Sequence, residues 1–234
     1  MRESILTIPI NEVFEPCSGC PICRMRNDVE QHIAEYIMGA AMMEPDVRME
    51  TNRLGFCYQH FNDLLKQNNR LSLALMLNSY LAELRTGVFE NKNIFFSKNA
   101  KAKKSAESTQ TCFVCSKVEW GVNHMLETVF TMFVNDAKFR TLYNSQEYIC
   151  VPHYNLLMVK AQEKLSKSDL KAFEKATNAL IEKYIHSLNK DVDSFCNSFD
   201  YRNAKKLHSP EMEHVRNSIE RAVEFLTSRK PYEK

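Results

Sequence analysis

Glycine, proline and tryptophan are scarce in this chain of 234 residues, which has five glycines, seven prolines and one tryptophan. So few turn-forming residues argue against a β architecture with many tight turns and leave room for long helices. An excess of one charge is also missing, because 31 basic and 29 acidic side chains leave a formal net charge of +2. Sequence-independent binding to nucleic-acid phosphates usually requires a strongly basic balance, which this chain does not have.

Long apolar runs are absent as well. The first ten residues contain no apolar stretch of the length found in signal peptides, and no later segment approaches the roughly 20 apolar residues of a membrane span. We therefore expect a cytoplasmic protein that does not enter a membrane. Hydrophobic residues still make up 44% of the chain, which is enough to supply a core.

Eight cysteines are the most informative feature of the sequence. In a reducing compartment, cysteines are more often metal ligands or buried thiols than disulfides. Six of them, with two histidines, form Cys-x-x-Cys pairs that are each followed by a Cys-x-x-His pair: Cys20, Cys23, Cys57 and His60, then Cys112, Cys115, Cys150 and His153. The first cysteines of the paired motifs are 37 residues apart in one set and 38 in the other. This internal repeat predicts two similar halves, residues 1–96 and 111–234, joined by a polar, lysine-rich linker at 97–110.

The hydrophobic pattern predicts an all-α fold. Apolar residues recur every three or four positions after each cysteine pair, which is typical of amphipathic helices. Pro152 is tolerated only in the first turn of a helix, so Cys150 should stand at a helix start. Further helices are predicted after Ser168 and from Ser209 onward. The segment Leu71–Arg85 is so densely apolar that we expect it to be buried.

Three cysteines and one histidine form a closed tetrahedral ligand set that is common in structural zinc sites. We expect each half to hold one zinc ion with its own four residues, giving two ions per chain. A cysteine at a helix start and a histidine three residues later lie on one face, and the helix N-terminus favours the thiolate. An iron–sulfur cluster could use similar ligands, although its usual cysteine runs are absent. Cysteines that merely pack as small apolar residues would not explain two matched quartets.

Two cysteines remain outside these quartets. Cys17 precedes Cys20 by three residues and is either a free thiol or a substitute ligand. Cys196 falls on the apolar side of a predicted helix, and we expect it in the core. A thioredoxin-like use of either Cys-x-x-Cys pair would need a βαβ surrounding that the pattern does not predict.

Three runs carry a likeness to a known family: residues 36–48 (YIMGAAMMEPDVR), residues 55–60 (GFCYQH) and residues 69–75 (NRLSLAL), with DYRN at 200–203 near the end. Through these runs the chain resembles an uncharacterised family of bacterial proteins known only as a domain of unknown function. The resemblance implies a bacterial cytoplasmic origin and supplies no activity.

Closed ligand sets without a catalytic constellation favour a non-enzymatic zinc-binding module that serves as an adaptor for a protein partner. Nucleic acid is a weaker candidate, because the lysines between 98 and 104 have no interleaved aromatic residues. The alternative is a thiol- or zinc-dependent enzyme, or a redox sensor, that uses Cys17 or a zinc site with an open position.

Overall fold

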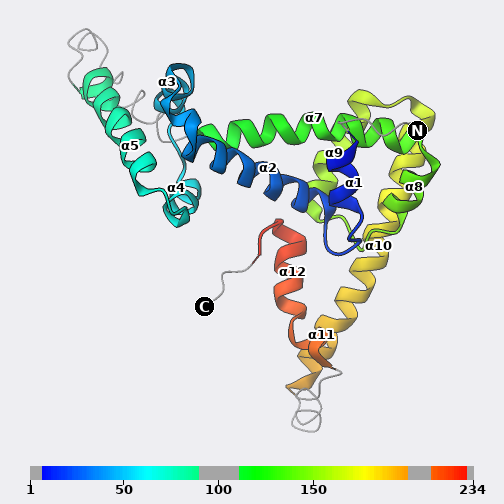
Figure 1. The fold of residues 1–234 in the computed structure, drawn as a ribbon. Coiled ribbons are helices and arrows are strands. Elements are labelled where there is room, and N and C mark those ends of the chain that lie inside the picture. The colour runs from blue at the N-terminus through cyan, green and yellow to red at the C-terminus, as the bar shows by residue number, and fades with distance from the viewer. Residues whose placement is uncertain (1–6, 90–110, 200–211, 231–234) are drawn as a thin grey trace, which may run out of the picture. The chain divides into compact units, whose positions relative to one another are not determined.

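The computed structural model describes residues 7–89, 111–199 and 212–230 (Figure 1). Over these ranges the chain forms helices and no strand, which confirms the all-α prediction. The α-helices are α1 (Ile8–Phe14), α2 (Pro21–Met38), α3 (Pro45–Leu54), α4 (Tyr58–Lys66), α5 (Arg70–Leu84), α7 (Phe113–Asn135), α8 (Ala137–Asn144), α9 (Val151–Lys164), α10 (Lys167–Ser198), α11 (Glu213–Arg216) and α12 (Ser218–Thr227). A 3-10 turn, η1 (Ala40–Met43), precedes α3, and a π-helical turn, η2 (Arg85–Phe89), follows α5.

The helices divide into two compact units that do not follow the two sequence halves. Unit 1 comprises residues 1–25 and 124–234, and unit 2 comprises residues 26–123. Each unit therefore takes segments from both halves, whereas the repeat predicted halves at 1–96 and 111–234. The predicted linker at 97–110 lies outside the described residues.

An aromatic cluster forms the centre of unit 1. Tyr143 of α8 is fully buried and its ring lies within 6 Å of Phe14, Phe133 and Phe173, at centroid distances of 5.9, 5.2 and 5.3 Å. Its hydroxyl forms a hydrogen bond of 2.8 Å with Thr177 of α10, which satisfies the one polar atom that burial would otherwise leave unpaired. The cluster thus joins α1, α7, α8 and α10.

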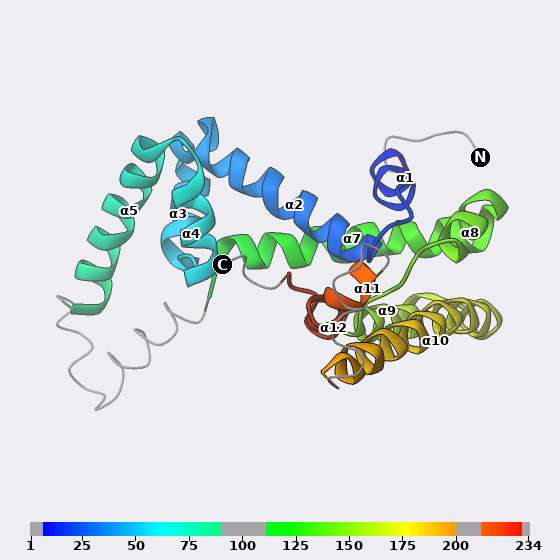
Figure 2. The ribbon, with the colours of Figure 1, turned by 90° about the horizontal axis from the view of Figure 1, so that it is seen from below.

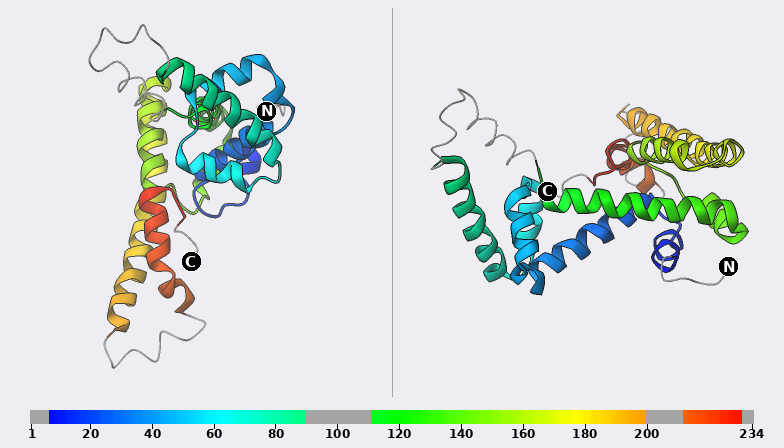
Figure 3. Two further views of the ribbon diagram at one scale, coloured as in Figure 1. Left: turned by 90° about the vertical axis from the view of Figure 1, so that its left-hand side faces the viewer. Right: turned by 90° about the horizontal axis from the view of Figure 1, so that it is seen from above.

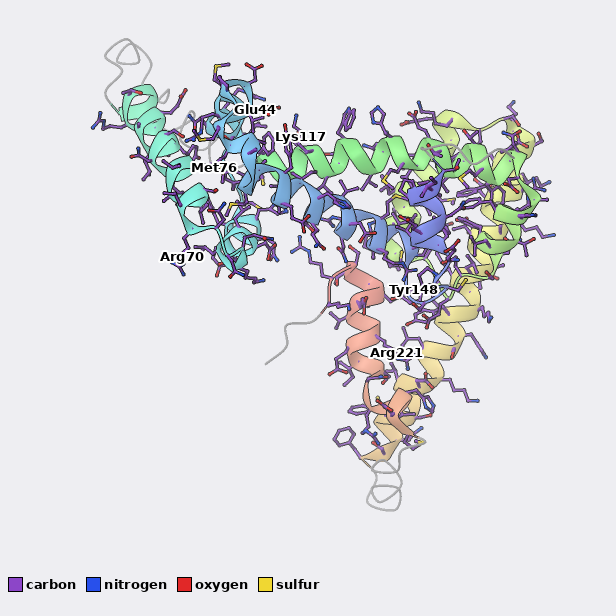
Figure 4. The ribbon with its side chains drawn as sticks, in the orientation of Figure 1. Glu44, Arg70, Met76, Lys117, Tyr148 and Arg221 are labelled. Atoms are coloured by element: carbon purple, nitrogen blue, oxygen red, sulfur yellow. The ribbon has the colours of Figure 1, made fainter. Side chains whose placement is uncertain are left out.

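The C-terminal helices of unit 1 pack on α9 and α10. Figure 2 shows α9, α10 and α12 together, and the left view of Figure 3 shows α12 alongside the later part of α10. Arg221 extends from α12 (Figure 4) and donates to the Asp191 carboxylate of α10 at 2.7 Å. The ring of Tyr148 stacks on Tyr184 at 4.0 Å, and Phe225 of α12 covers both rings.

Unit 2 places α3 against α5. Arg48 of α3 donates to the carbonyl of Leu75 and to the hydroxyl of Ser79, both on α5. Asn69 caps α5 by accepting from the amide of Ser72. Gly55 ends α3 with a φ of +61°, a left-handed value that glycine adopts without steric cost.

Two burial predictions are wrong. Only Ser72, Leu73 and Met76 of α5 are buried, whereas Leu71 and Leu81 are 68% and 61% exposed. Cys196, expected in the core, is exposed on α10. In both cases the apolar pattern does indicate a helix. Among the described residues of unit 2, however, α3, α4 and η2 leave much of α5 exposed, and the buried side of α10 runs through Leu188 and Asp191.

The predicted long helix after Ser168 is α10, and the predicted start of the last helix at Ser209 lies outside the described residues. Among the described helices, none is long and apolar enough to cross a membrane.

Candidate metal centres

In unit 1, four donor side chains converge from the starts of two helices. Cys20 directly precedes α2 and Cys23 lies in its first turn, while Cys150 is the N-cap of α9 and His153 lies in the first turn of that helix. Their donor atoms all lie within 4.8 Å of one another. We call these four residues the unit 1 site.

Unit 2 repeats the arrangement with the other four residues. Cys57 is the N-cap of α4 and His60 lies in its first turn, while Cys112 directly precedes α7 and Cys115 lies in its first turn. These donor atoms also lie within 4.8 Å of one another. We call them the unit 2 site. The prediction that Cys150 begins a helix is confirmed, and Cys20, Cys57 and Cys112 hold equivalent positions.

The spacing of the donors fits a tetrahedral ion and not a disulfide. The sulfurs of Cys23 and Cys150 are 3.6 Å apart, and those of Cys57 and Cys115 are 3.9 Å apart. A disulfide would place them at about 2.05 Å. Thiolates bound to zinc at about 2.3 Å in a tetrahedron are separated by roughly 3.8 Å. In both sites the histidine presents Nδ1 to the cysteines, at sulfur to nitrogen distances between 3.1 and 3.7 Å.

The two sets of three cysteines and one histidine are confirmed, but their expected assignment to separate halves is wrong. Each Cys-x-x-Cys pair joins the Cys-x-x-His pair of the other half. Sequence spacing could not reveal this, because one Cys-x-x-His pair completes either Cys-x-x-Cys pair equally well.

Contacts just ahead of the ligands explain the crosswise arrangement in unit 2. The backbone amide of Phe113 donates to the carbonyl of Gly55 at 2.9 Å, and the Thr111 hydroxyl donates to the carbonyl of Leu54 at 2.7 Å. These bonds fix Thr111 and Phe113, on either side of Cys112, beside the residues that lead to Cys57. The two helix starts that follow are therefore held next to each other.

Side-chain contacts do the same in unit 1. The Gln146 amide donates to the carbonyl of Phe14 at 2.7 Å, and the Phe14 ring packs between Phe139 and Tyr143. These bonds join the approach to Cys20 with the approach to Cys150. Arg24 fixes the same loop, donating from Nε to the carbonyl of Val13 and from Nη1 to that of Ser18.

The three thiols of the unit 1 site strongly influence one another's ionisation. Burial opposes ionisation of Cys20, but hydrogen bonds from Cys150, Cys23 and His153 outweigh it and lower the pKa of the Cys20 thiol well below its usual value. The hydrogen bond with Cys150 raises the pKa of Cys23, and that with Cys20 raises the pKa of Cys150 to about 12. One thiolate thus keeps its neighbours protonated, because adjacent like charges repel.

In the unit 2 site too, the cysteines and the histidine shift one another's pKa values. Burial raises the pKa of Cys112, yet its hydrogen bond with His60 prevails and brings that pKa down to about 6. Burial and the charge of Cys112 raise the pKa of Cys115 to about 12. Burial alone would lower the pKa of His60, but hydrogen bonds with Cys112 and Glu30 raise it to about 10. A divalent cation would relieve the repulsion and allow all three thiols to ionise.

The two sites differ in their exposure to solvent. In the unit 1 site Cys20, Cys150 and His153 are all buried. In the unit 2 site Cys115 is exposed and Cys57 is half-buried. The other ring nitrogen of His60, Nε2, forms a hydrogen bond with the carboxylate of Glu30 on α2. No sequence motif indicates this contact, because the two residues belong to separate helices.

Cys17 lies outside both donor groups. Its sulfur is 3.4 Å from the Ser145 hydroxyl and accepts from the Gln146 amide at 3.5 Å. Its backbone has a φ of +51°, within the loop that precedes α2. The structure therefore assigns Cys17 to loop contacts and brings no catalytic partner to its thiol among the described residues.

Comparison with known proteins gives one match. A family described as "Family of unknown function (DUF6062)" matches residues 1–233. No curated protein and no solved structure gives a significant match.

Crosswise coordination predicts which thiols depend on each other. In metal-loaded Cys57→Ser, Cys112 and Cys115 should become reactive toward N-ethylmaleimide, while Cys20 and Cys23 stay protected, because only the unit 2 site loses a ligand. The matched variant Cys150→Ser should show the reverse. Mass spectrometry of the alkylated peptides measures both. Exposure of Cys20 and Cys23 in Cys57→Ser would instead indicate coordination within each half.

Metal binding should release protons. At pH 7.5, raised pKa values keep Cys23 and Cys150 protonated in the metal-free unit 1 site, and Cys115 and His60 in the unit 2 site. Zinc must displace at least two protons per ion, so the apparent Kd should tighten about 100-fold or more per pH unit near neutrality and weaken as the pH falls. Titration of zinc into weakly buffered protein with a pH indicator measures the release. Fewer than two protons per ion would contradict the pKa shifts.

Proposed function

The chain belongs to DUF6062, a family of unknown function, and we propose that it is a zinc protein whose two ions are structural. The observation that carries this proposal is the convergence of three cysteines and one histidine in each unit. Such a donor set fills the tetrahedron of a zinc ion and leaves no position for water or substrate, which favours a structural role over a catalytic one. Thiolate-rich ligands are also the kind that zinc prefers over harder cations.

Each ion would connect distant parts of the chain. In both sites, one helix start comes from the first half of the sequence and the other from the second half. Bound metal would therefore close long loops, whose ordering costs conformational entropy in the absence of a cross-link. The aromatic cluster of unit 1 supplies a further source of stability that does not depend on metal.

We further propose that the zinc-stabilised helices serve as a protein-interaction module, with α5 as the surface that contacts the partner. The outward side of this helix carries an apolar stripe of Leu71, Ala74, Leu81 and Ala82, with the polar Asn78 between them, where a solvent-facing helix would normally carry more charges. An apolar helix face that the described residues of its own unit leave uncovered is typical of a binding surface. A largely apolar surface of this kind suits a protein partner better than a nucleic acid, whose phosphates require a strongly basic surface.

Zinc content tests the first proposal. Protein purified without added metal should contain about two zinc ions per chain, and removing them with a chelator should lower the free energy of unfolding. Cys57→Ser or Cys150→Ser should each cost several kcal/mol, because a structural site contributes its binding energy to folding. Plasma mass spectrometry and denaturant unfolding measure the two quantities. The control Cys196→Ser, exposed and outside both sites, should change neither. Protein without zinc, or with iron in its place, would contradict the proposal.

Site-specific cross-linking tests the interaction role. A photo-reactive phenylalanine analogue at Leu81 of the full chain should capture one predominant protein in native cells, since Leu81 lies on the apolar stripe. The same analogue at Glu83, exposed on the same helix but outside the stripe, is the matched control. Identical products at both positions, or products that nuclease digestion removes, would contradict a protein-binding α5.

A further inference from the structure

The unit 2 site has a feature behind its histidine that the unit 1 site lacks. Nε2 of His60 bonds to the carboxylate of Glu30, whereas no acidic side chain among the described residues lies within ion-pair distance of His153. His60 is 4% exposed, so this bond is largely shielded from water. Within the repeat, Glu30 stands seven residues after Cys23, and the residue seven after Cys115 is Val122, which has no side-chain acceptor.

Glu30 fits the role of an orienting carboxylate. For Nδ1 of His60 to bind a metal, the proton of the neutral imidazole must reside on Nε2. The Glu30 oxygen accepts that proton in a hydrogen bond and so fixes both the tautomer and the rotation of the ring. Partners of this kind also make the imidazole a stronger ligand.

The surroundings of Glu30 leave it committed to His60. Its side chain is 26% exposed and borders a cavity of about 280 Å³ that Asn27, Gln31 and Lys66 also line. Lys66, the cation of this cavity, pairs with Asp63 at 2.9 Å. Among the described residues, His60 is the hydrogen-bond partner of the Glu30 carboxylate.

The unit 2 site also has the greater need for such support. Cys115 is exposed and Cys57 half-buried, whereas in the unit 1 site Cys23 alone is half-buried and the other three residues are buried, so water and competing ligands reach the unit 2 site more readily. Resting on the proposed zinc binding, we infer that Glu30 is a positioning residue that orients His60 and thereby sets the metal affinity of the unit 2 site. The unit 1 site retains its metal by burial of its ligands.

The test compares both sites within one molecule. Full-length, zinc-loaded protein is challenged with a chromogenic chelator, and the thiols released are identified by alkylation and mass spectrometry. Cys57, Cys112 and Cys115 report on the unit 2 site, and Cys20, Cys23 and Cys150 serve as the internal reference. Glu30→Ala should weaken zinc binding at the unit 2 site by roughly 10- to 100-fold and leave the unit 1 site unchanged.

Two further variants separate positioning from a general effect on the helix. Glu30→Gln keeps an oxygen that accepts from Nε2, so it should restore part of the lost affinity. Glu35→Gln alters another, exposed carboxylate of α2, which accepts a hydrogen bond from Gln31 and makes none with His60, and should behave as wild type. Cobalt absorption bands should show a tetrahedral unit 2 site that loses its metal first in Glu30→Ala.

The outcomes distinguish this inference from the proposed function. Equal loss from both sites in Glu30→Ala, or unit 2 affinity equal to that of wild type, would overturn the positioning role while leaving structural zinc intact. Failure of the wild-type protein to hold zinc at either site would overturn the proposed function itself.

Discussion

At each candidate metal centre the starts of two helices come together, and the rest of the structure depends on this constraint. Each candidate metal centre joins one Cys-x-x-Cys pair with the Cys-x-x-His pair of the other sequence half. Unit 1 is assembled from two separated segments, residues 1–25 and 124–234, whereas unit 2 is the continuous segment 26–123 between them. The carbonyl of Gly55 accepts a hydrogen bond from the amide of Phe113, and the side-chain amide of Gln146 donates to the carbonyl of Phe14. These bonds hold together the segments that lead to the two helix starts of each centre.

Helix electrostatics and thiol chemistry act together at these centres. The positive end of a helix dipole favours a thiolate, and two such ends meet at each centre. Neighbouring thiolates repel, however, and burial together with the charge of Cys112 raises the pKa of Cys115 to about 12. A divalent ion bound among these thiols would relieve their repulsion, and its binding would then contribute to the free energy of folding.

The helices and the donor residues were predictable from the sequence, whereas the pairing of the donors and the burial of some residues were not, for physical reasons. Periodicity predicted the helices, and the repeated spacing predicted all eight residues of the two donor groups, because local chemistry decides both. The crosswise pairing depends on long-range contacts such as Phe113 with Gly55, which have no local signal. The burial of α5 and of Cys196 was predicted wrongly because burial also depends on long-range contacts. An apolar helix face in the sequence does not reveal which other element, if any, covers it. Glu30 escaped prediction because its partner belongs to another helix.

Anomalous diffraction at the zinc absorption edge tests the central claim most directly. Crosswise zinc coordination predicts two peaks per chain. One should be bounded by Cys20, Cys23, Cys150 and His153, and the other by Cys57, His60, Cys112 and Cys115. A peak enclosed by Cys20, Cys23, Cys57 and His60, or the absence of peaks from metal-replete protein, would contradict it.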